Sequence, residues 1–104
     1  MPTVNVQLYG STDTGFAIII NPWCAVVSQT GDKEIQWISD RQVKIVYDEP
    51  GHFPNHAASP NGQPKAKSGP LDSAAQLGTY HYTIQIKNDK GVWITVDPDY
   101  RIER

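Results

Sequence analysis

Apolar and polar residues alternate with a period of two along most of this sequence, and no other pattern limits its possible folds as strongly. Between residues 3 and 9, Val4, Val6 and Leu8 occupy every second position, and residues 79–87 repeat the alternation. Successive side chains of a β-strand point to opposite faces, so this pattern indicates strands with one face in a core. No segment has a sustained helical period. The sequence therefore predicts an all-β fold.

Turn residues divide the chain into seven or eight short strands. We expect them at residues 3–9, 16–20, 23–28, 34–37, 42–47, 79–87, 92–96 and 100–102. The runs at 16–20 and 23–28 are continuously apolar, which is typical of strands buried on both faces. Short strands joined by turns favour an antiparallel two-sheet β-sandwich, with a closed barrel as the structural alternative.

Residues 48–78 interrupt the alternation. Five of the eight prolines fall in this segment, together with the turn dipeptides Asn61-Gly62 and Ser68-Gly69. We expect one long, irregular, proline-rich loop there. The 104 residues suffice for one core, and neither a repeat nor a composition shift divides them, so residues 1–104 are expected to form a single domain.

Composition excludes several classes of function. A net charge of -2 argues against a nucleic-acid-binding protein, which needs concentrated Lys and Arg. No uninterrupted apolar run approaches the ~20 residues of a spanning helix, so no membrane is expected. One cysteine excludes an internal disulfide and a cysteine-based zinc site. That lone cysteine and an N-terminus without a leader pattern indicate the cytoplasm.

Two stretches of the chain resemble immunoglobulin-like domains. Cys24 precedes Trp37 by thirteen residues, and L-G-T-Y-H-Y follows after a gap. The segment G-T-Y-H-Y-T-I-Q-I-K, followed by a turn and V-W-I-T-V-D-P, is also similar to small bacterial cupredoxin-like and immunoglobulin-like sandwiches of unassigned function. The resemblance implies that Tyr80 forms a tyrosine corner and that Asp72 lies in the turn before it. Tyr82 stands where the second cysteine would be.

A histidine-rich segment suggests a metal site. His52 and His56 are four residues apart, and Asp48 and Glu49 lie just upstream. These are suitable donors for Zn²⁺ or Cu²⁺, and His81 is a candidate third ligand. The flanking prolines forbid a regular helix, so convergence of the imidazoles depends on the conformation of the loop. The alternative is a solvated loop that contains two histidines by chance.

Type 1 copper is excluded on the residues present. Such a site needs a cysteine thiolate, two histidines close to it and usually an axial methionine. Cys24 comes early in the chain without a nearby following histidine, and Met1 is the only methionine. We expect Cys24 to be a core residue. Because no catalytic arrangement or phosphate-binding loop is evident, we do not expect an enzyme.

The remaining candidates form a binding surface. Trp93 lies between Val92 and Ile94 and so faces away from the expected core, where it contacts a partner or is covered by the loop or the terminal strand. Ile19 gives its strand a second apolar face, and His81 is on an outward face. The sequence thus favours a binding or self-associating module, with a protein partner or a homo-oligomer, whose contacting surface includes Trp93, Ile19 and the 48–78 loop. A metal-binding protein and a small lectin-like, carbohydrate-binding module are the alternatives.

Overall fold

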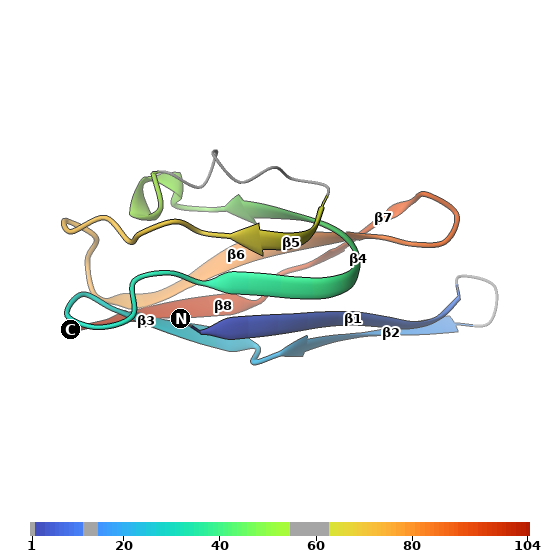
Figure 1. Ribbon diagram of the computed structural model, residues 1–104, viewed down its shortest axis with the longest axis horizontal. Helices are drawn as coiled ribbons and strands as arrows, with labels where there is room; N and C mark the ends of the chain where they lie inside the picture. The colour runs from blue at the N-terminus through green and yellow to red at the C-terminus, as the bar shows by residue number, and fades with distance from the viewer. Residues whose placement is uncertain (1, 12–14, 55–62) are drawn as a thin grey trace.

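The computed structural model describes residues 2–11, 15–54 and 63–104 as an elongated, all-β molecule with principal extents of 45 × 23 × 21 Å (Figure 1). The strands are β1 (Thr3–Ser11), β2 (Gly15–Asn21), β3 (Cys24–Ser28), β4 (Gln36–Tyr47), β5 (Gln63–Lys67), β6 (Gly78–Lys87), β7 (Trp93–Val96) and β8 (Asp99–Glu103). One short 3-10 helix, η1 (Pro50–His52), follows β4. In the described part of the chain, no helix has the length and apolar character needed to cross a membrane.

The strands form one mixed sheet in the order β2-β1-β4-β6-β8-β3, with β5 added to β4 and β7 added to β6. β1 pairs with β4 in parallel, and β3 pairs with β8 in parallel. The expectation of an antiparallel two-sheet sandwich is therefore wrong in detail, although the all-β class is confirmed. Alternation reports which face of a strand is buried and carries no information about the direction of its neighbour.

The sheet curves strongly and is nearly a barrel, but it is open, because its end strands β2 and β3 do not pair with each other in the described structure. β4 pairs first with β1 and then with β6, while β6 pairs with β8 through its first half and with β4 and β7 through its second half. The end strands β2 and β3 are consecutive in the chain, separated by Pro22 and Trp23. They lie one after the other along the lower side of Figure 1.

The core occupies the inside of this curved sheet. The alternating residues predicted to face inward are buried, including Val4, Val6, Trp37, Tyr82 and Ile84. The end strands depart from the prediction, because each buries one face only. Ala17 and Ile19 of β2 and Val26 of β3 are exposed, whereas Ile20, Ala25 and Val27 are buried. An end strand of a single curved sheet has the core on one side and solvent on the other.

Residues 48–78 are more regular than expected. They contain η1 and also β5, which pairs with β4 in antiparallel fashion. Phe53, Ala66 and Leu71 from this segment are buried in the core. The buried Ser68 forms two hydrogen bonds with Ile35. Its amide donates to the Ile35 carbonyl, and its Oγ accepts from the Ile35 amide, each at 2.8 Å. The interpretation of this whole segment as an irregular loop is corrected accordingly.

Candidate binding surface

His52 belongs to an aromatic cluster at one end of the core. Its Nδ1 lies 2.6 Å from the Tyr100 hydroxyl, and its ring contacts the Tyr80 ring edge-on with centroids 4.4 Å apart. Tyr100 is fully buried. These contacts give His52 a packing role in the folded protein. His56, the other proposed metal ligand, lies outside the described residues.

His81 projects from the other face of β6. Tyr80 and Tyr82 beside it point inward, whereas His81 is exposed and its Nδ1 contacts the Asp99 carboxylate of β8. Because His52 packs against the inward Tyr80, the sheet itself separates the imidazoles of His52 and His81. Among the described residues, no group of three His, Cys, Asp or Glu side chains is arranged to hold a metal ion. His81 instead shares an open hollow with Asp48 and Asp97.

Cys24 is half-buried on the end strand β3, so its assignment to the core is wrong. The inward positions of that strand belong to Ala25 and Val27. Burial, reinforced by the nearby charge of Asp99, raises the pKa of the Cys24 thiol. The protonated thiol is a poor nucleophile.

The residues that carry the immunoglobulin-like resemblance make specific contacts. The Tyr80 hydroxyl donates to the Gln76 carbonyl at 2.9 Å, the bond that a tyrosine corner forms to the backbone just upstream. Asp72 begins the preceding turn, where its carbonyl accepts from the Ala75 amide at 3.1 Å. In the core, the Trp37 indole donates to the Tyr82 hydroxyl at 3.0 Å. Sequence reasoning missed this last bond, because it joins residues far apart in the chain.

Trp93 is half-buried on the outer face of the sheet. It lies opposite Lys87, while the neighbouring pair Ile86 and Ile94 faces the core. The Lys44 Nζ lies 4.2 Å from the centroid of the Trp93 ring, and the Lys87 Nζ lies 5.7 Å from it. These distances permit cation–π attraction. Sequence periodicity indicated the outward direction of Trp93, but only strand pairing identifies the lysines that cover it.

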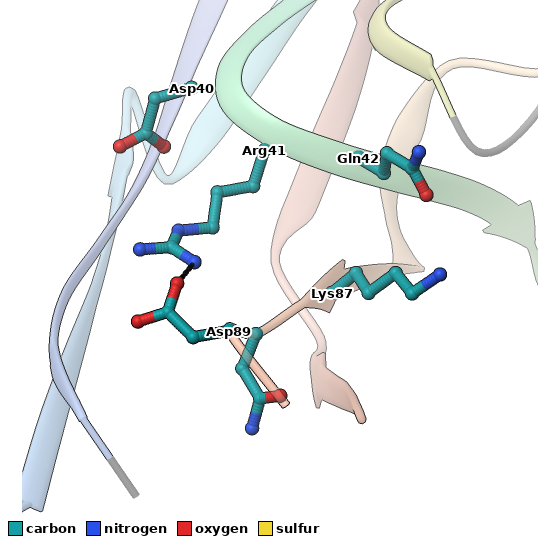
Figure 2. Close-up of a pocket in the computed structure, with 6 residues that line it drawn as sticks. Asp40, Arg41, Gln42, Lys87 and Asp89 are labelled. Atoms are coloured by element: carbon teal, nitrogen blue, oxygen red, sulfur yellow. Dashed lines mark hydrogen bonds and ion pairs between the residues drawn. The ribbon is translucent and has the colours of Figure 1, made fainter. Parts of the chain in front are cut away.

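An open hollow lies close to this tryptophan, between the bend of β4 and the β6–β7 turn (Figure 2). Arg41 crosses it to pair with Asp89, and this hydrogen bond raises the pKa of the guanidinium. Asn88, also in the lining, accepts from the Lys90 and Val92 amides through Oδ1, each at 2.9 Å. Its Nδ2 is buried without a hydrogen-bond partner. Because that donor is shielded from solvent, a ligand in the hollow does not reach it.

Ile19 lies on the outer face of β2, with 48% of its surface exposed. Tyr9, on the same face of the neighbouring β1, is 51% exposed. β2 is an end strand, and β1 is its one strand partner in the described structure. The β1 and β2 sequences, TVNVQLYGS and GFAIIIN, contain no charged residue, although 19% of the whole chain is charged. Strands β1 and β2 therefore present exposed, uncharged outer residues beside a backbone edge that no other described strand covers.

The three residues proposed as one binding surface do not form one patch. In the strand order, β1, β4 and β6 lie between β2, which carries Ile19, and β7, which carries Trp93. His81 is on β6, in the half that pairs with β8. The molecule thus presents the β1–β2 edge and the lysine-flanked Trp93 as separate candidate surfaces.

No protein-family model matches the chain, and no curated protein matches it.

Proposed function

We propose that this protein is a non-enzymatic binding module that associates with a protein partner, or with itself, through the exposed edge of its β1–β2 hairpin. The observation that carries the proposal is the combination, on one end strand, of a free backbone edge and the exposed Ile19. Surfaces at the centre of protein interfaces are depleted in charge and enriched in apolar and aromatic side chains. Tyr9 and Ile19, on two strands without a charged residue, fit that description.

A resemblance to immunoglobulin-like domains is part of the same proposal. It is supported by the Tyr80 corner bond and by the burial of Trp37 against Tyr82. An exposed sheet edge is a surface to which a partner can add a strand. The resemblance is limited to these local features, because the parallel pairing of β1 with β4 and of β3 with β8 differs from an antiparallel sandwich.

The test is the effect of Ile19→Lys on association. The substitution places a charge in the middle of the proposed contact and removes exposed apolar area, so we expect binding to fall at least tenfold. Partners retained from a lysate by the immobilised protein, and its sedimentation behaviour, are compared between wild type and variant. Val46→Lys is the matched control, because Val46 is 51% exposed on β4 and lies away from the edge.

If Ile19→Lys leaves every interaction unchanged while Trp93→Ala removes it, the binding surface is the lysine-flanked tryptophan and the edge assignment is wrong. If neither substitution changes any interaction, neither candidate surface is the binding site.

A further inference from the structure

We propose that the occupant of the β2 edge is a second copy of this chain, paired antiparallel to β2 about a two-fold axis at Ile18. This inference rests on the proposed function and specifies its partner. An end strand exposes N–H and C=O groups along its free side, and a second strand satisfies them by extending the sheet. In an isologous dimer, the same strand supplies both halves of this contact.

The edge strand β5 shows how this molecule protects a strand edge that stays unpaired. β5 is also paired on one side, and it carries Pro64, Lys65 and Lys67. Proline and lysine on an edge strand hinder pairing with another chain. β2 has seven residues and carries neither. β3 and β7 are also paired on one side and also lack proline and lysine, but they have only five and four residues, and a very short edge strand is itself protected. β2, with seven residues, is thus the least protected edge, and we infer an occupant for it.

The second end strand, β3, is a weaker candidate. It has only five residues. Its neighbour β8 carries three charged residues, Asp99, Arg101 and Glu103, so the surface beside the β3 edge is charged. β2 is longer, and its neighbour β1 is uncharged. A second copy brings an identical surface to the contact, and identical surfaces repel unless they are free of net charge. The strands β1 and β2 meet that condition, and the β3–β8 pair offers a charged surface.

The pleat of the strand restricts the register. A two-fold axis perpendicular to the sheet keeps the core faces of both copies on one side, so inward residues must lie opposite inward residues. Centring the pair on Ile18 satisfies this rule and matches all seven residues of the strand, from Gly15 to Asn21. A shift of the centre by one residue keeps the faces matched but leaves two residues of each strand unpaired.

This register also matches side-chain sizes on the outer face. Ile19 of each copy lies opposite Ala17 of the other, so a large exposed side chain meets a small one in both symmetry-related positions. Directly opposed residues of antiparallel strands have Cβ atoms about 5 Å apart. The exposed Ile19 is then covered by the partner, with Tyr9 of each copy beside the contact.

Sedimentation velocity on the purified full chain over a concentration series tests the pairing. We expect a dimer for the wild type and for Val46→Lys. Ile19→Lys should raise the dissociation constant at least tenfold, because the introduced ammonium groups become diagonal neighbours across the two-fold axis. Circular dichroism of each variant verifies that the fold is retained.

A spin label at Gln7→Cys, in a Cys24→Ser background, tests the register. The two label positions are separated by three strand spacings across the sheet and two residues along it, about 16 Å between backbones before the label arms are added. A dimer that lacks this short distance, or one that withstands Ile19→Lys, overturns the β2 pairing. A wild type that stays monomeric also overturns it. If Ile19→Lys then still removes a partner captured from the lysate, the proposed binding function survives and only self-pairing fails.

Discussion

Two tyrosine hydroxyl groups on β6 make specific hydrogen bonds, one within a turn and one across the core. The Tyr80 hydroxyl closes the turn before β6 by donating to the Gln76 carbonyl, and the Tyr82 hydroxyl accepts from the Trp37 indole inside the core. Tyr82 occupies the position at which the immunoglobulin-like pattern has its second cysteine. At the position where that pattern has a disulfide-forming cysteine, this protein has a tyrosine that is hydrogen-bonded to the buried Trp37.

At this scale we predict the effect of removing one hydroxyl. Tyr80→Phe keeps the ring contact with His52 and loses the bond to Gln76, so the free energy of unfolding should fall by about 0.5–1.5 kcal/mol. Urea unfolding measures the change. Tyr9→Phe is the control, because its hydroxyl bonds only the neighbouring Gln7 side chain at the surface and its loss should cost less than about 0.5 kcal/mol. Equal effects of the two substitutions would contradict a stabilising corner.

At the scale of elements, the segment between β5 and β6 behaves as part of the core. Its backbone is anchored by the Leu71 amide, which donates to the Lys33 carbonyl at 2.8 Å, and by the reciprocal bonds between Ser68 and Ile35. Leu71 is 4% exposed, whereas Leu77, near the start of β6, is 54% exposed. The proline-rich composition of this part of the chain concealed a packed segment.

Substituting these two leucines gives a matched test of that packing. Leu71→Ala should lower the free energy of unfolding by about 2–5 kcal/mol, because it removes buried apolar atoms and leaves a cavity. Leu77→Ala makes the same chemical change at an exposed position and should cost less than about 0.5 kcal/mol. Urea unfolding of both variants provides the measurement. A small loss for Leu71→Ala would show that this segment contributes little to the core.

At the scale of the whole molecule, buried tyrosines fill one end of the curved sheet. Tyr47 from β4, Tyr82 from β6 and Tyr100 from β8 pack with Phe53, with ring centroids between 5.1 and 6.4 Å apart in the contacting pairs. Burial raises the pKa of all three tyrosines well above the ordinary value. The folded state therefore favours their neutral form.

Alkaline pH should unfold the protein for this reason. Below about pH 10, the pKa of an unfolded tyrosine, the three tyrosines are neutral in both the folded and the unfolded state, and their contribution to the free energy of unfolding is fully present. Above that pH the unfolded chain loses protons that the folded protein keeps, so the free energy of unfolding falls by up to about 1.4 kcal/mol per pH unit for each residue. Tyrosinate absorbance and circular dichroism, followed together, should show these groups ionising as β-structure is lost. The chain unfolded in denaturant is the control. Ionisation of all tyrosines with the sheet intact would contradict the prediction.

Local reasoning succeeded wherever a property depends on neighbouring residues in the chain. Alternation identified most of the strands and their inward faces, so the burial of Trp37 and Ile84 and the outward direction of Trp93 follow from a period of two. It missed β5 and divided the continuous β4 into two strands. The continuous apolar runs misled, because Ile19 and Val26 are exposed on end strands. A run of apolar residues does not reveal whether a second layer exists to cover its other face.

The tertiary structure decided everything that depends on which strands lie side by side. It paired β1 with β4 and β3 with β8 in parallel, brought Lys44 and Lys87 to Trp93, and put His52 and His81 on opposite faces of the sheet. Strand faces come from the geometry of one backbone segment, and the amino-acid pattern encodes them directly. Strand neighbours come from competition among long-range contacts across the whole chain, and no local pattern records the outcome.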